Sequence, residues 1–175
     1  VFKNLNLKNV ELNVCSSTII YGKKFDSVLG KTYESIFDEC KNTKNVNYFG
    51  FLDNKKIIQM LKKMHIFSHP SIWPETSCVA AIESMAAGCE VVTTDLGALS
   101  ETCSSFGTFV NFDRNFDNLE KKYGNVLLNS IKNFWSNKNQ NKLKLQTKTI
   151  NATYSWDVRS VEWKNFFDKV RKLKS

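Results

Sequence analysis

The stretch WPETSCVAAIESMAAGCEVVTTDLGALSE, residues 73–101, decides the fold of this 175-residue chain. Its run 79–87 consists mostly of small, good helix formers. Thr76 or Ser77 precedes the run as a helix cap, and Gly88 follows where a left-handed terminating residue belongs. The stretch therefore predicts one tight helix with a defined start and end.

A strand and a second turn follow this helix. Residues 91–94 form a β-branched run, and the Asp-Leu-Gly sequence at 95–97 breaks it before a second short helix. The same alternation predicts further strands at 10–15, 46–49, 65–68 and 107–112, and helices at 27–41, 54–64 and 116–135. We expect an α/β, Rossmann-like domain with a parallel sheet flanked by helices. In such a sheet, ligands gather at the carboxyl ends of the strands, which nominates the turns at 50–53, 69–73 and 95–98.

The two ends of the chain are also expected to be helical. Residues 1–7 are typical of the tail of a helix, and the polar segment 137–144 is either a helix start or a short ordered connection. The aromatic-rich segment 154–175 predicts a helix, capped by Asp157, that docks on a surface. Packing within the same domain explains most of those aromatic side chains equally well.

Two carboxylates punctuate the central stretch, Glu75 before its helix and Glu83 within it. A carboxylate on a packed, alanine-rich helix needs hydrogen-bond partners, because burying an unpaired charge is very costly. Sugar hydroxyls could donate these hydrogen bonds to the carboxylates. The free N–H groups at 76–79, at the start of the helix, favour a phosphate. The spacing therefore suits a nucleotide sugar, with Glu75 near the sugar and Glu83 near the ribose. Taken singly, each residue is explained as well by a solvated glutamate or an ordinary cap.

Taken together, these residues resemble the signature of retaining, family 4-like glycosyltransferases of the GT-B fold, the glycosyl transferases group 1. Glu75 and Glu83 have the spacing of the family's Glu-x7-Glu motif, and the AAG turn into the strand and the segment ending at Glu101 are also similar. Weaker similarity extends over 45–71 and 154–167. The chain departs from the family where Thr-Ser-Cys replaces a common Gly-Phe-Gly sequence after Glu75, where Glu90 replaces a common proline, and where Ala98 replaces a common second glycine.

The resemblance implies that residues 1–175 form the C-terminal, donor-binding half of a GT-B enzyme of glycan biosynthesis. It implies a hexosyltransferase that moves sugar from a nucleotide diphosphate to an acceptor, with retention of anomeric configuration and with no metal or other cofactor. The implied sugar contact is Glu75, and the other implied donor contacts are Leu52, His69, Thr76, Ser77, Cys78, Val79 and Glu83.

The acceptor class, whether glycan, lipid or protein, cannot be assigned from the sequence. In the resembling family, the first strand and a basic loop precede the point where this chain begins, and a preceding N-terminal domain carries most of the acceptor site. We therefore expect the chain to lack that first strand and to transfer no sugar by itself. Two other functions stay open: a non-catalytic module that binds a nucleotide or a partner protein, and a related GT-B epimerase or phosphorylase. No lysine suited to a pyridoxal cofactor can be singled out, which disfavours a phosphorylase.

Composition and net charge indicate which partners and which cellular compartment to expect. The formal net charge of +8 favours anionic partners, but no nucleic-acid-binding motif is present, so we expect a solvated basic surface and no nucleic-acid partner. Transient, peripheral contact with an anionic membrane is a secondary expectation, which a lipid-linked acceptor would fit. No run approaches the about 20 apolar residues of a membrane span. The five cysteines form no CxxC pair, which favours reduced thiols in a cytoplasmic setting and no zinc site.

Overall fold

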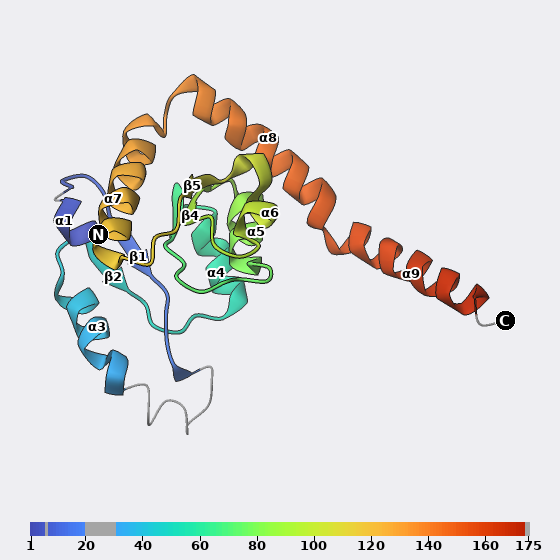
Figure 1. Cartoon of the computed structure of the whole chain (residues 1–175), viewed down its shortest axis with the longest axis horizontal. Coiled ribbons are helices and arrows are strands. Elements are labelled where there is room, and N and C mark those ends of the chain that lie inside the picture. The colour runs from blue at the N-terminus through green and yellow to red at the C-terminus, as the bar shows by residue number, and fades with distance from the viewer. Residues whose placement is uncertain (6, 20–30, 174–175) are drawn as a thin grey trace. The chain divides into compact units, whose positions relative to one another are not determined.

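A computed structural model describes residues 1–5, 7–19 and 31–173 of the chain. The chain divides into two compact units, Val1–Gln59 and Met60–Ser175. Both contain parallel strands connected by helices (Figure 1).

The first unit contains a two-stranded parallel sheet. Strand β1 (Leu12–Val14) pairs with β2 (Val46–Tyr48), with Leu12 opposite Val46. Among the described residues of this unit, the other elements are α1 (Phe2–Leu5), α3 (Lys31–Asn42) and the start of α4 (Asn54–Leu61). The Phe37 ring of α3 stacks on Tyr48 at 5.3 Å between ring centroids. Both strands were predicted, and so was α3. Residues 27–30 of the predicted helix lie outside the described part of the chain.

The second unit contains a three-stranded parallel sheet, in the order β3-β4-β5. Its strands are β3 (Ile66–His69), β4 (Glu90–Thr94) and β5 (Thr108–Val110). Its helices are α5 (Val79–Ala87), α6 (Leu99–Cys103), the 3-10 turn η3 (Ser104–Phe106), α7 (Phe116–Asn133), α8 (Asn137–Tyr154) and α9 (Trp156–Lys172). Parallel strands joined by helices confirm the predicted α/β, Rossmann-like class.

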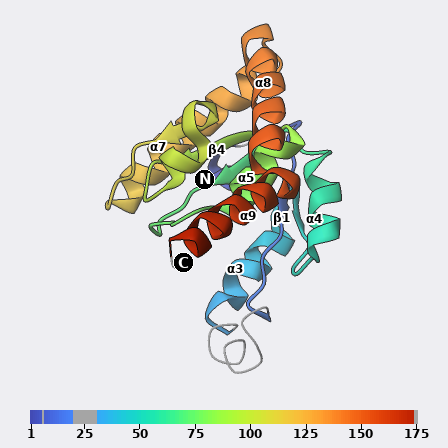
Figure 2. The same cartoon turned by 90° about the vertical axis from the view of Figure 1, so that its right-hand side faces the viewer.

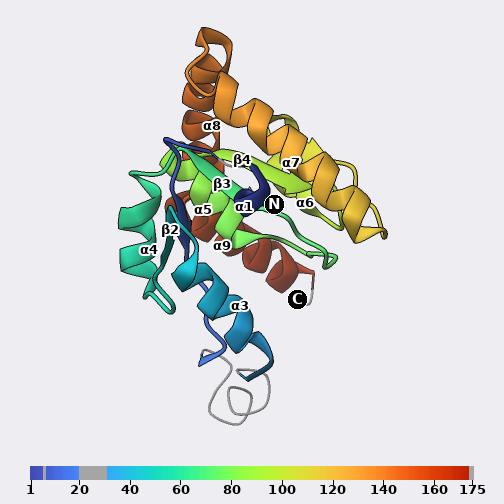
Figure 3. The ribbon, with the colours of Figure 1, turned by 90° about the vertical axis from the view of Figure 1, so that its left-hand side faces the viewer.

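Strand β4 lies in the middle of this sheet, and every residue of it is buried. Successive strand side chains point to opposite faces, so Glu90 and Val91 face different layers. Val91 packs in the core cluster with Ala81 and Met85 of α5. Glu90 faces the other layer, where it accepts a hydrogen bond from Ser130 of α7. Helices α5 and α7 therefore cover opposite faces of the sheet (Figure 3).

Glu90 is a buried carboxylate whose oxygens are satisfied by neutral donors. The residue is only 4% exposed. Its Oε1 accepts from Thr108 Oγ1 at 3.0 Å and Ser130 Oγ at 2.9 Å, and its Oε2 accepts from Asn139 Nδ2 at 3.0 Å. Since these donors come from β5, α7 and α8, Glu90 ties three elements to the start of β4.

The polar segment 137–144, expected to be either a helix start or a short connection, is the start of the continuous helix α8. The helix packs against α5 (Figure 2). Gln146 Nε2 donates to the carbonyl oxygens of Met85 and Cys89, on either side of the end of α5. That end has the predicted left-handed glycine, Gly88, at φ 95°. Helix α8 thus fixes the C-terminal end of the helix that carries the predicted site.

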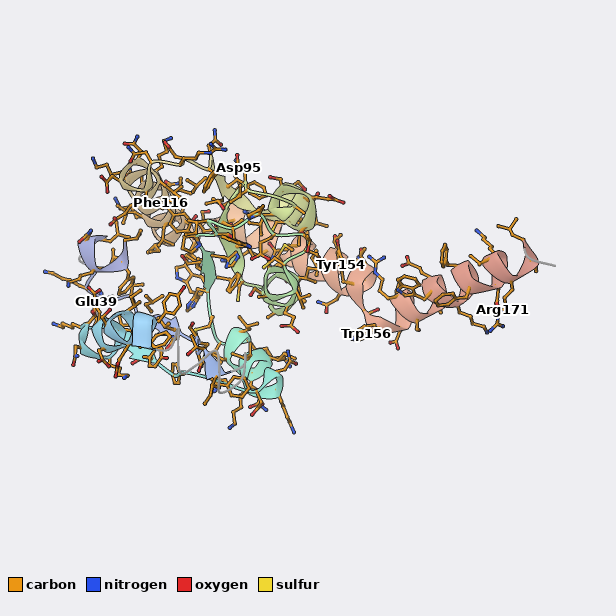
Figure 4. All side chains as sticks on the ribbon, turned by 60° about the horizontal axis from the view of Figure 1, so that its bottom comes forward. Glu39, Asp95, Phe116, Tyr154, Trp156 and Arg171 are labelled. Atoms are coloured by element: carbon orange, nitrogen blue, oxygen red, sulfur yellow. The ribbon has the colours of Figure 1, made fainter. Side chains whose placement is uncertain are left out.

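Helix α9 extends beyond α8 and away from the strands of its unit (Figures 1 and 4). Its cap is Ser155, whose side chain accepts from the Val158 N–H, and the prediction of Asp157 was wrong because the helix begins earlier. The rings of Trp163, Phe166 and Phe167 pack on one another while remaining exposed. Docking of this helix stays a prediction. Among the helices that the structure describes, none is long and apolar enough to cross a membrane.

The role of Glu90 can be tested with Glu90→Gln. Glutamine keeps the shape but replaces one acceptor oxygen by an N–H₂ group that faces existing donors. We expect a loss of about 1.5 to 3 kcal/mol in the free energy of unfolding, measured by urea denaturation. The matched control is Glu120→Gln at an exposed position of α7. Equal stability of the two variants would show that the network does not hold the elements together.

Candidate functional site

The segment after β3 is fixed at its start by two threonines of the neighbouring strand. Thr93 Oγ1 donates to the His69 carbonyl oxygen at 2.9 Å, and Thr94 Oγ1 donates to the Ser71 carbonyl oxygen at 2.7 Å. Both threonines are buried. The chain therefore leaves the sheet in a defined direction immediately before the predicted site residues.

The same segment is fixed further on by the turn after β4. Glu75 and Gly97 form a parallel backbone bridge, and the Ala98 N–H donates to the Glu75 carbonyl oxygen at 2.8 Å. Gly97 has φ 64°, and a Cβ there would lie 2.6 Å from that oxygen and 2.7 Å from the Glu75 nitrogen. Only glycine permits this approach. The predicted turns 69–73 and 95–98 thus lie along one edge of the sheet, whereas the turn 50–53 belongs to the first unit.

Three of the predicted site residues come together at this edge. His69 Nε2 lies 3.2 Å from Glu75 Oε1 and 3.8 Å from Cys78 Sγ. The side chains of His69 and Glu75 are 27% and 30% exposed, whereas Cys78 is only 5% exposed. The His69 ring also stacks on Phe67, with 5.6 Å between ring centroids. The cluster is anchored on its protein side and open to solvent on the other.

These contacts alter the protonation of the imidazole. The hydrogen bond with Cys78 raises the pKa of His69 above its ordinary value, and interaction with Glu75 raises it further, while burial opposes both. A raised pKa means that the folded protein favours the protonated ring. His69 therefore carries positive charge to higher pH than an ordinary histidine, which suits a site for an anionic ligand.

Helix α5 begins beside this cluster, but its cap differs from the predicted one. The cap is Cys78, which makes no side-chain cap hydrogen bond, whereas Thr76 and Ser77 precede it in the loop and are exposed. The N–H groups of Ala81 and Ile82 both donate to the Cys78 carbonyl oxygen. The first N–H groups of a helix have no partner within it, so the amides before Ala81 are directed out of this helix end.

Glu83 lies on the more open side of α5. It comes four residues after Val79, so the two share a helix face, and Val79 is 62% exposed. The buried face consists of Ala81, Ser84 and Met85 instead, and Glu83 is half-buried. The prediction of a packed, alanine-lined environment for Glu83 was therefore too strong, because the neighbouring alanines divide between the two faces.

Two other positions considered from the sequence have different surroundings. Leu52 belongs to the first unit, where it lines a pocket with Gly50 and Ile57, and its contact with a base stays a prediction. Asp95 Oδ1 accepts from the Phe112 N–H at 2.7 Å, which joins the end of β4 to the segment after β5. That bond gives Asp95 a structural role.

The model of the family described as glycosyl transferases group 1 matches residues 3–149. The chain belongs to this family. The match includes the whole cluster and α5, and it ends within α8, before α9 begins. No curated protein matches the chain. Membership supports a transferase that acts on a sugar donor and an acceptor.

The bridge between Gly97 and Glu75 can be tested with Gly97→Ala. The new Cβ would collide with the Glu75 backbone, so we expect the Ala98 amide to lose its protection against hydrogen exchange. We also expect a stability loss of about 1 to 3 kcal/mol from backbone strain.

Gly88→Ala provides the matched control, because its φ is also positive but a Cβ there would meet only Thr147 Oγ1 at 3.5 Å. This variant should lose stability while the Ala98 amide stays protected. Loss of protection in both variants would show that general destabilisation, rather than the bridge, governs the turn.

Proposed function

We propose that this group 1 glycosyltransferase domain binds a nucleotide-diphosphate sugar at residues 75–83, as the donor-binding C-terminal half of a retaining, family 4-like hexosyltransferase. The observation that carries the proposal is the placement of Glu75. Its carboxylate lies beside the start of α5 on a backbone fixed by Gly97, next to a histidine that favours its charged form.

The start of α5 is the proposed position of the diphosphate. A helix N-terminus combines outward N–H groups with the positive end of the helix dipole, which together favour phosphate. Thr76, Ser77, Cys78 and Val79 supply the backbone of this site. His69, which keeps its proton to higher pH than an ordinary histidine, adds positive charge beside Cys78. Negative charge develops on the diphosphate when its bond to the sugar breaks, so these groups stabilise the departing diphosphate without a metal or other cofactor.

The two carboxylates divide the sugar contacts in this proposal. Glu75 accepts hydrogen bonds from hydroxyls of the transferred hexose, and Glu83, one turn into α5 from Val79, accepts from the ribose. The acceptor oxygen then replaces the diphosphate oxygen at the anomeric carbon, on the same face of the ring. The acceptor is a glycan, lipid or protein, held by a preceding GT-B domain. The net charge of +8 suits peripheral contact with an anionic membrane on its cytoplasmic side.

Calorimetry with Glu83→Ala tests the ribose contact. We expect the affinity for UDP, GDP or ADP, whichever binds the wild type, to fall by about 1 to 3 kcal/mol, because a charged hydrogen-bond partner is lost. The fold should survive, since Glu83 is half-buried and lies off the buried face of α5. Glu120→Ala is the control, and equal affinities in the wild type and Glu83→Ala would refute the assignment.

Glu75→Gln tests the sugar contact, because it removes the charge and keeps the shape. The variant should weaken binding of the nucleotide sugar more than binding of the bare nucleotide. The difference between the two losses, measured by the same calorimetry, isolates the contribution of the sugar. Equal losses for both ligands would contradict a role at the sugar.

A further inference from the structure

The cluster of His69, Glu75 and Cys78 has a geometry that the donor site does not require. In a catalytic relay of cysteine, histidine and carboxylate, the two ring nitrogens of the histidine serve different partners. Here one nitrogen, Nε2, faces both the Glu75 carboxylate and the Cys78 sulfur. The three groups are therefore not arranged as a relay. Their ligand atoms instead converge, all within 4.8 Å of one another.

Two of the three separations between these atoms are close to the edges of a tetrahedral metal site. Zinc bonds of about 2.0 to 2.3 Å at tetrahedral angles place nitrogen and oxygen ligands about 3.4 Å apart, and sulfur and nitrogen ligands about 3.6 Å apart. The observed separations from His69 Nε2 are 3.2 Å to Glu75 Oε1 and 3.8 Å to Cys78 Sγ. The third edge, between the Glu75 carboxylate oxygen and Cys78 Sγ, is no longer than 4.8 Å.

We propose that His69 Nε2, Glu75 carboxylate oxygen and Cys78 thiolate bind Zn²⁺ or a similar thiophilic divalent cation, with the fourth position open to solvent. One sulfur, one nitrogen and one oxygen ligand suit zinc, whereas Mg²⁺ and Ca²⁺ require sets rich in oxygen. The lack of a CxxC pair predicted no zinc site, whereas these three ligands follow the spacing His-x5-Glu-x2-Cys.

The surroundings hold the three ligands in place. Cys78 is the N-cap of the nine-residue helix α5 and is buried. Metal binding replaces the thiol proton of Cys78 and, where the His69 ring is protonated, the proton on its Nε2, and both protons are released to solvent. The bonds from Thr93 and Ala98 hold the backbones of His69 and Glu75, so little ordering is needed. Metal enters from the side where the side chains of His69 and Glu75 are partly exposed.

A bound cation should prevent the donor from binding. This effect rests on the proposed function, whereas the metal site itself does not. The cation would be coordinated by the Glu75 carboxylate and would lie at the start of α5, where the sugar and the diphosphate are proposed to bind. Zinc and donor should therefore compete, and zinc should act as an inhibitor of donor binding.

Titration of the reduced 175-residue chain with Co²⁺, under anaerobic conditions, tests the metal site alone. A sulfur-to-cobalt charge-transfer band should rise to saturation at equimolar Co²⁺ and disappear when Zn²⁺ is added. Cys78→Ser should abolish the band, while His69→Gln and Glu75→Gln should weaken Co²⁺ binding by at least about tenfold. Circular dichroism of each variant checks the fold.

Cys15→Ser and Cys40→Ser are the controls, because both residues are less buried thiols in the first unit. The band should persist in both. Absence of a band in the wild type, its survival in Cys78→Ser or its loss in a control would each overturn the proposal.

Donor binding is then measured by calorimetry, first with a chelator and then with Zn²⁺. Donor binding measured with the chelator tests the proposed function alone. If no donor binds but the cobalt band is present, the proposed function is refuted and the metal site is not. Zinc should weaken donor binding in the wild type and leave it unchanged in Cys78→Ser. Equal donor affinity with and without zinc in the wild type would refute competition.

Discussion

The candidate site depends on one close approach of two backbones, that of Gly97 to Glu75. A side chain at position 97 would meet the Glu75 peptide at 2.6 to 2.9 Å, and no rotamer relieves a collision between a Cβ and a backbone. The glycine therefore allows the loop after β3 to pair with the turn after β4. Because both loops start from adjacent parallel strands, the sheet itself determines where the Glu75 carboxylate stands.

The second determinant of the site is the support of α5 from behind. The buried face of the helix packs on the sheet, and Gln146 and Gly88 satisfy the carbonyl groups at its C-terminal end. The N-terminal end stays open, with Cys78 as a cap that makes no side-chain cap hydrogen bond. A helix held at one end and open at the other offers its amides to an anion. The proposed cation is held instead by the side chains of His69, Glu75 and Cys78, against the positive end of the helix dipole.

Much of this fold could be predicted because its signals are local. The small residues of α5, the left-handed Gly88 and the β-branched run of β4 each act through the conformation of their own segment, and all three were predicted correctly. Helix starts were less certain, since several neighbouring residues can serve as caps. Cys78 replaced Thr76 or Ser77, and Ser155 replaced Asp157, in each case a shift of one or two positions.

The rest could not be predicted because it depends on contacts between distant segments. Glu90 looked like an unexplained replacement of a proline, and its three donors come from residues 18 to 49 positions away. The role of Gly97 could not be predicted either, because it depends on the Glu75 backbone lying against it. His69, Glu75 and Cys78 were all named from the sequence as donor contacts, but only the loop geometry brings their ligand atoms together.

Saturation-transfer NMR with a panel of UDP-, GDP- and ADP-sugars, in buffer that contains a chelator, tests the assignment of the donor site most directly. We expect saturation to pass from the protein to both the ribose and the hexose protons of at least one donor, with the preferred base identified by the strongest transfer. An absence of transfer to every donor, in a chain shown by circular dichroism to be folded, would contradict the assignment.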